Sequence, residues 1–439
     1  MAPAASDPAR RKLGLWMATA LVVGNMIGSG VFLLPASLGV YGGVSLVGWG
    51  FTTMGALLLA LTFARLARAY PRAGGPYAYT RVAFGDFPAF LVAWGYWLST
   101  CVGNAAIAVA MVGYLGFFSP ALAASPALAA GAAVAAIWLL TWVNARGVRE
   151  AGGVQVVTTT LKLLPLLAIA MFGLAFLHPA NFVPFNVSGR SDLSAISATA
   201  ALTLWAFLGL ESATIPAGEV ERPERTIPRA TLLGTAAAAL VYVAGTAAVM
   251  GVMRPATLAA STAPFADAAR AMWGPWAAKA VAAGAVVSCF GALNGWILLQ
   301  GQLPLAAAAD GVLPRVFGRL SSRGTPAAGL VISSVLVTLV VATNYSRGLV
   351  VEFTFIILLA TLATLVPYVF SMMAFVALRV REYGWPSGGR GAGPLVVALL
   401  AFGYSVWAIA GIGWEALLWG AGLLLAGVPL YLRSVRRLR

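Results

Sequence analysis

Small residues interrupt the first long apolar stretch of the sequence at a point where a backbone could bind a small anion. The run Gly28-Ser29-Gly30 lies midway along that stretch, and such residues are poor helix formers. A break at membrane depth frees backbone N–H and C=O groups, which are tolerated only where they line a cavity or are buried in protein. The half-helix after the break would direct its positive dipole end at a carboxylate. Close packing of small residues between helices is an equal alternative for this run alone.

Two ionisable groups lie inside other apolar stretches. Glu211 lies between Gly209 and Ser212, and an intramembrane carboxyl group is a functional candidate by default. The alternative is a carboxyl group satisfied by structural hydrogen bonds. Lys162 lies well inside the fifth apolar stretch, where a lysine needs a partner or loses its proton, unless its ammonium group reaches the membrane surface.

The two candidate breaks, near residues 28 and 209, occupy corresponding places in two sets of five apolar stretches. Such a pattern is the best sequence indication of a transporter built from inverted repeats, with its site at the membrane midplane. No clear residue-level repeat links the two halves. The prediction therefore depends on the positions of the breaks.

The elements that position these residues are predicted to be membrane helices. Hydrophobic residues make up 61% of the 439 residues and charged residues only 9%, against roughly a quarter in soluble domains. This composition excludes a soluble enzyme, a disordered protein and a fibrous protein. A helix needs about 20 apolar residues to cross a bilayer. Twelve stretches meet this requirement, at residues 14–40, 44–68, 87–118, 127–146, 153–178, 193–218, 229–252, 273–303, 326–344, 350–378, 393–411 and 414–433.

Charge predicts the orientation of this all-α, multi-pass membrane protein. With the N-terminus inside, 22 of the 28 lysine and arginine residues lie in cytoplasmic segments and 4 lie in outer segments. Both termini are therefore expected in the cytoplasm, with the helices in a bacterial inner membrane. The net charge of +15 comes from short clusters between apolar stretches, so we expect the lipid bilayer and no nucleic acid as a partner.

Motifs of other functional classes are missing from the sequence. It has no H-E-x-x-H, P-loop or G-x-S-x-G motif, so an enzyme is not expected and ATP is not expected as the energy source. One histidine, His178, and two separated cysteines, Cys101 and Cys289, cannot supply a usual metal site. No cofactor is expected. A channel or a nutrient sensor is a further alternative, but no polar pore ring or output domain is visible.

Four segments together resemble one family of transporters. They are Gly28-Ser29-Gly30-Val31-Phe32, residues 205–212, residues 223–230, and Gly295-Trp296 followed by residues 309–314. The combination, over residues 12–380, resembles the amino acid–polyamine–organocation superfamily, and most of all bacterial arginine/agmatine antiporters and their basic amino acid/polyamine relatives. The resemblance implies a five-plus-five inverted repeat with broken helices 1 and 6. Relatives are often homodimers, and the sequence leaves the oligomeric state open.

The resemblance implies a division into three parts. These are a cytoplasmic tail at residues 1–13, a transporter core at 14–378 and the last two helices with a basic C-terminus at 379–439. The core would contain the repeats at about 14–178 and 193–378.

The resemblance also implies roles for individual residues. The substrate carboxylate would meet Ser29 and Gly30, with Asn25 near by, and the amino group would meet carbonyls around Leu208 in the sixth helix. Trp205 would cover the substrate, while Thr100, Asn104 and Trp296 would surround its side-chain end. Gating or proton sensing would involve Tyr96, Glu211 and Tyr368. Packing or structural hydrogen bonds are the alternative for each aromatic, amide and hydroxyl side chain.

Lys162 departs from the arginine/agmatine pattern. It resembles the fifth-helix lysine of sodium-independent amino acid transporters, whose ammonium group stands where sodium sits in sodium-coupled relatives. Its implied contacts are first-helix carbonyls near Gly28 and the eighth-helix Ser288. We therefore expect a sodium-independent exchanger of small-molecule amino acids or amines, best matched by arginine against agmatine. A neutral amino acid exchanger and a proton-coupled permease on the same fold are the alternatives.

Overall fold

The computed structural model describes residues 12–261, 263–347, 349–384, 392–410 and 414–436. These residues form helices, and the one β-type pairing among them is a single bridge between Leu13 and Val220. The first half of the chain contains α1 (Leu15–Met26), α2 (Gly30–Gly39), α3 (Ser45–Ala69), α4 (Pro76–Phe84), α5 (Asp86–Leu115), α6 (Pro120–Ala124), α7 (Pro126–Arg146) and α8 (Val148–Phe172). The second half contains α9 (Asp192–Leu204), α10 (Pro223–Val252), α11 (Pro255–Ala259), α12 (Pro264–Trp273), α13 (Pro275–Ala309), α14 (Ala327–Arg347), α15 (Leu349–Tyr383), α16 (Ala392–Ala410), α17 (Trp414–Ala426) and α18 (Val428–Arg436).

The predicted all-α, multi-pass membrane architecture is confirmed. Within the described ranges, ten helical segments are long and apolar enough to cross a membrane, and two shorter apolar helices cover residues 327–343 and 417–432. Several boundaries differ from the prediction: α8 ends at Phe172 rather than near 178, α10 begins at Pro223 rather than near 229, and α13 continues to Ala309 rather than ending near 303. The last predicted stretch divides at Gly427, where a Cβ atom would lie 2.6 Å from the ring of Trp94.

Two membrane-spanning segments are broken, as the sequence predicted. The first consists of α1 and α2, with an irregular backbone between Met26 and Gly30. The second ends its α-helical part at Leu204 and continues as short 3-10 turns through Thr214. Gly209 has a φ of +102° in this segment, a conformation that residues with a Cβ atom rarely adopt. The breaks place three α-helix ends inside the bundle, namely the last turns of α1 and α9 and the first turn of α2.

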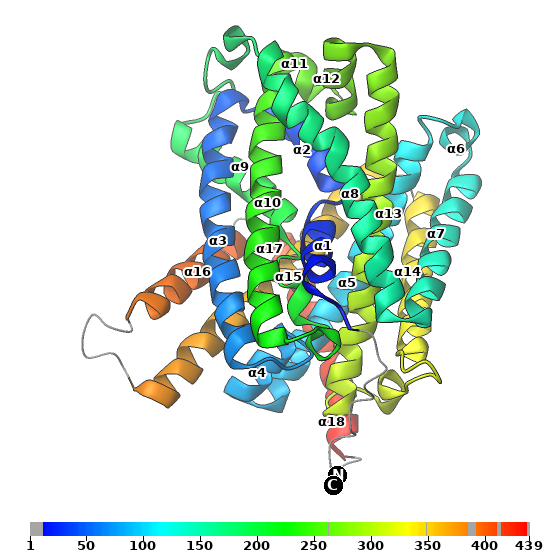
Figure 1. Cartoon of the computed structure of the whole chain (residues 1–439), viewed down its shortest axis with the longest axis vertical. Helices are drawn as coiled ribbons and strands as arrows, with labels where there is room; N and C mark the ends of the chain where they lie inside the picture. The colour runs from blue at the N-terminus through cyan, green and yellow to red at the C-terminus, as the bar shows by residue number, and fades with distance from the viewer. Residues whose placement is uncertain (1–11, 262, 348, 385–391, 411–413, 437–439) are drawn as a thin grey trace.

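The broken segments lie inside a shell of continuous helices (Figure 1). The first half-helix, α1, packs against α8, α10 and α13, while α5 packs against α13 and α15. Figure 1 shows α11 and α12 at the upper end of the molecule and α4 and α18 at the lower end. Large apolar side chains remain exposed on the outer helices, among them Leu164 on α8 and Leu240 on α10. Such a surface is suited to contact with lipid rather than with water.

Two amphipathic helices, α4 and α12, were not predicted from the sequence because they are short and carry polar positions. One of them, α4, lies at the lower end and follows Gly74 and Gly75, which both have positive φ angles. The Gly74 N–H donates to the carbonyl oxygen of Ile215 at 2.8 Å, next to the end of the second broken segment. This contact fixes α4 beneath the break.

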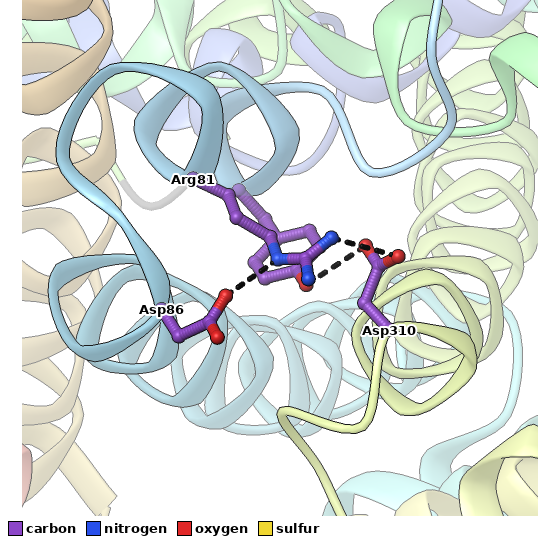
Figure 2. Close-up of polar contacts among 4 residues, drawn as sticks. Arg81, Asp86 and Asp310 are labelled. Atoms are coloured by element: carbon purple, nitrogen blue, oxygen red, sulfur yellow. Dashed lines mark hydrogen bonds and ion pairs between the residues drawn. The ribbon is translucent and has the colours of Figure 1, made fainter.

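A polar cluster joins α4 to the lower end of α13 (Figure 2). Arg81 Nη1 lies 2.8 Å from Asp310 Oδ1, and Arg81 Nε donates to Asp86 Oδ1 at 2.7 Å. The Tyr77 hydroxyl donates to Asp310 Oδ2 at 3.0 Å. Burial and the neighbouring Asp310 carboxylate raise the pKa of Tyr77, so the hydroxyl stays protonated and remains a donor at physiological pH. Asp310 therefore receives two donors from α4.

We predict that Asp310→Asn loosens α4 more than Asp86→Asn does. The first change weakens contacts between two distant helices, whereas the second affects a local, exposed pair. A loss of about 1 kcal/mol corresponds to roughly a fivefold rise in the opening of α4. Hydrogen exchange of the amides at residues 76–84 measures this opening. Equal exchange in the two variants would contradict the assigned importance of Asp310.

Candidate substrate-binding site

A narrow cavity of about 50 Å³ lies where the two breaks face each other. Every residue predicted to bind substrate lines it except Asn104. The lining consists of Asn25, Met26, Gly28, Ser29, Gly30, Ser99, Thr100, Gly103, Ile107, Trp205, Ala206, Leu208, Trp296 and Thr364. Met26, Ser99, Gly103 and Thr364 were not singled out from the sequence, because each is an ordinary small or apolar residue within a membrane-spanning helix.

The first break presents a helix N-terminus to the cavity. Ser29 and Gly30 begin α2, whose first N–H groups have no partners within the helix. The indole of Trp205 covers Gly30 so closely that a Cβ atom there would lie 2.7 Å from two ring atoms. Only glycine permits this approach. The N-terminus of α2 therefore meets an aromatic plane across a short gap.

The second break is held from outside the cavity. The Tyr242 hydroxyl on α10 donates to the carbonyl oxygen of Ala206 at 2.9 Å. Asn25 Nδ2 donates to Ser212 Oγ at 2.8 Å, while Trp296 Nε1 donates to the carbonyl oxygen of Asn25 at 3.2 Å. These bonds connect both breaks with α13. Asn25 Oδ1 is buried and accepts no hydrogen bond from the described residues.

The far end of the cavity is polar but uncharged. Ser99 and Thr364 share a hydrogen bond of 2.8 Å between their hydroxyl oxygens, and Thr100 lies beside them. None of the lining residues that the structure describes is acidic or basic. Recognition of a cation here would use aromatic faces, hydroxyl groups and carbonyl oxygens.

Asn104 lies behind this wall. It is fully buried on α5, and its Nδ2 atom donates to Gln300 Oε1 at 2.7 Å. Gln300 in turn donates to Ser334 Oγ on α14 at 3.0 Å. The structure therefore places Asn104 in a network between helices, one helical turn beyond Thr100. Its Oδ1 atom is buried and has no partner among the described residues.

The three predicted gating residues meet in one cluster. The Tyr96 hydroxyl on α5 and the Tyr368 hydroxyl on α15 both donate to the fully buried Glu211 carboxyl group. The Gly209 N–H donates to the Tyr368 oxygen at 3.1 Å. Trp205 begins the irregular part of the second segment, and Glu211 lies further along it. The segment continues to Glu219, whose carbonyl oxygen accepts from the Leu13 N–H at the lower end. The cluster thus lies between the cavity and the lower end.

Lys162 holds the first break from the opposite side. Its side chain is fully buried on α8, and Nζ donates to the carbonyl oxygens of Gly24, at 2.8 Å, and of Ile27. Ser288 Oγ on α13 donates to the carbonyl oxygens of Ile27 at 3.1 Å and Gly28 at 3.2 Å. These donors satisfy carbonyl groups that the interrupted helix leaves without intrahelical partners.

Comparisons with known proteins agree with this geometry. The family described as amino acid permease matches residues 13–426. A cadaverine/lysine antiporter of Escherichia coli (strain K12) is 37% identical over 385 residues, which cover 85% of this chain and 86% of that protein. The putrescine transporter PotE of the same strain is 32% identical and covers 97% of both chains. A putrescine transporter PotE of Haemophilus influenzae is 32% identical and covers 96% of both.

These matches extend through both broken segments and the cavity between them. They agree with the superfamily that the sequence segments resemble and with its basic amino acid/polyamine branch. The chain belongs to the amino acid permease family of the amino acid–polyamine–organocation superfamily.

Proposed function

We propose that this chain is a sodium-independent antiporter that exchanges a basic amino acid for the amine formed by its decarboxylation. As a family member it transports amino acids or amines and is not an enzyme. The exchange of a basic amino acid for its amine is supported by the cavity between the two breaks, where a helix N-terminus and two tryptophan rings surround an uncharged space. We place the transporter in a bacterial inner membrane with the lower end, and both termini, in the cytoplasm.

The proposed substrates share a cationic end and differ at the other end. The carboxylate of the amino acid would bind at Ser29 and Gly30, where the α2 dipole favours an anion. The amine product lacks that carboxylate, so its recognition would rely on Trp205, Trp296 and the hydroxyl groups. A cation over an aromatic face gains about 0.5–2 kcal/mol, and this gain is available to both substrates.

Alternating access would require movement on both sides of the cavity. In the present conformation its volume is about 50 Å³, and Trp205 covers one side. The Glu211 cluster joins three segments on the other side. We propose that Trp205 moves to admit substrate and that separation of Tyr96 and Tyr368 from Glu211 opens the lower path.

Lys162 supports sodium independence. Its ammonium group binds two carbonyl oxygens at the first break, where a sodium ion would otherwise bind oxygen ligands. Ser288 contributes from α13. We propose that this lysine braces the first broken segment permanently, so that no ion has to bind in each cycle.

Two substrate pairs are candidates for this site. The segments of the sequence favoured arginine against agmatine, while the Escherichia coli relative with 37% identity is a cadaverine/lysine antiporter. The uncharged lining also favours a second candidate function, exchange of neutral amino acids. Proton-coupled uptake on the same fold is the remaining alternative.

The test is uptake of labelled arginine, lysine and leucine into sodium-free proteoliposomes preloaded with agmatine, cadaverine, putrescine or leucine. We expect the matching amine to accelerate entry of its basic amino acid, and empty vesicles to take up little. Acceleration by leucine alone would replace the proposal with neutral exchange. Uptake into empty vesicles that follows a pH gradient would replace it with proton coupling.

Trp296→Ala is expected to weaken cationic substrates more than neutral ones. Loss of one cation–π contact would lower the apparent affinity for the cationic substrate by about 2- to 30-fold. Trp142→Ala is the control, because Trp142 is 52% exposed on α7 and does not line the cavity. Competition of each substrate against labelled uptake gives the affinities. An equal loss of affinity for cationic and neutral substrates would show that Trp296 makes no cation–π contact with the substrate.

Lys162→Ala is expected to abolish most transport while the protein still inserts into the membrane. The change leaves the buried Gly24 carbonyl oxygen without its side-chain donor, and the Ile27 carbonyl oxygen keeps Ser288 alone. An unsatisfied buried group costs about 1–3 kcal/mol. Lys279→Ala is the matched control, since Lys279 is exposed on α13. Uptake, normalised to the amount of protein in the membrane, checks the prediction. Normal uptake by Lys162→Ala would show that the lysine does not brace the break.

Tyr96→Phe is expected to favour opening of the lower path by roughly fivefold, since one hydrogen bond contributes about 1 kcal/mol. Tyr114→Phe on the same helix is the control, because the buried Tyr114 hydroxyl has no partner among the described residues. The readout is labelling from the lower side of Ser99→Cys in a protein whose Cys101 and Cys289 are replaced. Equal labelling rates in both variants would show that the Tyr96 hydroxyl does not help to keep the lower path closed.

A further inference from the structure

A second pocket, with a basic lining, lies at the lower ends of α3 and α15, apart from the substrate cavity. Its volume is about 240 Å³, and the first turn of α16 completes its wall. Arg65 and Arg379 supply two guanidinium groups, and Glu382 supplies one carboxylate. The net charge of the lining is therefore positive. The proposed transport cycle does not use any of these side chains.

Within the part of the chain that the structure describes, neither guanidinium group has the carboxylate partner that such groups usually have. Arg65 Nη1 is buried and makes no hydrogen bond with any residue that the structure describes. Arg379 lies close enough that its positive charge acts unfavourably on Arg65. No ion pair links either arginine to a carboxylate among the described residues, and Glu382 lies beside the Tyr383 hydroxyl. Two like charges that share a partly buried pocket create a favourable place for an anion.

The surroundings of the pocket combine apolar and aromatic groups. Phe375 and Leu378 form part of its buried wall, and Tyr70 and Tyr383 belong to its lining. The Arg379 guanidinium lies 5.1 Å from the centre of the Tyr383 ring. Tyrosine and arginine are typical of the level at which a membrane meets water. Because α3 and α15 both end here, the pocket lies at that level.

An apolar surface continues from the pocket along α16. Val396, Leu399 and Leu400 follow its first turn and are between 48% and 55% exposed. Figure 1 shows α16 on the outside of the bundle, beside α3. A molecule with a phosphate at one end and acyl chains at the other would match both surfaces at once.

We propose that this pocket binds the phosphate group of an anionic phospholipid, with the acyl chains along α16. Guanidinium groups match phosphate oxygens with paired, charge-assisted hydrogen bonds, and basic pockets between membrane helices are suited to lipid headgroups. The apolar surface of α16 favours a lipid over a soluble phosphate. The bound lipid would connect α3 with α15, the helix that carries Tyr368 of the gate cluster.

Native mass spectrometry of the full chain in detergent tests this proposal with phosphatidylglycerol and, in parallel, phosphatidylcholine. We expect the Arg65→Gln, Arg379→Gln double variant to bind phosphatidylglycerol at least tenfold more weakly than the unmodified protein. The matched control is the Arg68→Gln, Arg381→Gln double variant, because those exposed arginines lie on the same two helices outside the pocket. Glu382→Gln removes the competing carboxylate and should strengthen binding severalfold.

Three outcomes would overturn the proposal. They are equal lipid binding by both double variants, equal binding of the two lipids, and displacement of phosphatidylglycerol by millimolar inorganic phosphate with no preference for the lipid. The last outcome would identify a site for soluble anions. A lysine double variant, Arg65→Lys with Arg379→Lys, keeps the charges and serves if the glutamine variant fails to fold. It should retain part of the affinity, because lysine lacks the bidentate geometry.

Discussion

A helix that is interrupted inside a membrane must find hydrogen-bond partners for the backbone groups that it exposes. No water is available in the bilayer core, and each unsatisfied group costs several kcal/mol. In this protein the partners come from side chains of neighbouring helices. Lys162 and Ser288 bind the carbonyl groups of the first break, and Tyr242 binds one carbonyl group of the second. The cavity exists because these donors stabilise both breaks from behind.

This requirement explains why the surrounding helices are arranged around the two short segments. α8 and α13 supply donors to the first break, and α10 supplies a donor to the second. The side of the breaks that faces the cavity carries the N-terminus of α2, which would be available to the proposed substrate. Support and the proposed binding thus use opposite sides of the same backbone.

Much of the architecture was predictable from the sequence because a membrane helix requires a long apolar stretch of residues. The breaks were predictable from Gly28, Ser29 and Gly30, and the buried charges from Glu211 and Lys162. The amphipathic α4 was not predictable by that approach, since it has only nine residues and lies between the long apolar stretches. The place of Asn104 was also not predictable from the sequence, because a step of one residue along α5, from Gly103 to Asn104, decides whether a side chain faces the cavity or Gln300.

Two glycines shape the candidate site because they leave room for neighbouring aromatic side chains. Gly30 permits the close approach of Trp205, and Gly209 permits that of Trp296. Their roles depend on three-dimensional neighbours that no local pattern reveals. Tyr242 is a similar case, because its hydroxyl reaches a carbonyl group in a different segment from a distant part of the chain.

The partners of Lys162 are carbonyl oxygens and not side chains. Every amino acid carries such an oxygen, so the attachment depends on the path of the first segment and not on the identity of the side chain at Ile27. At Gly24 the path requires glycine, because a Cβ atom there would overlap Gln155. Substitutions that reshape the cavity can therefore accumulate in that segment while its anchor is preserved. An anchor on backbone atoms lets side chains change while the backbone geometry stays the same. Related proteins can therefore share this geometry and still transport different substrates.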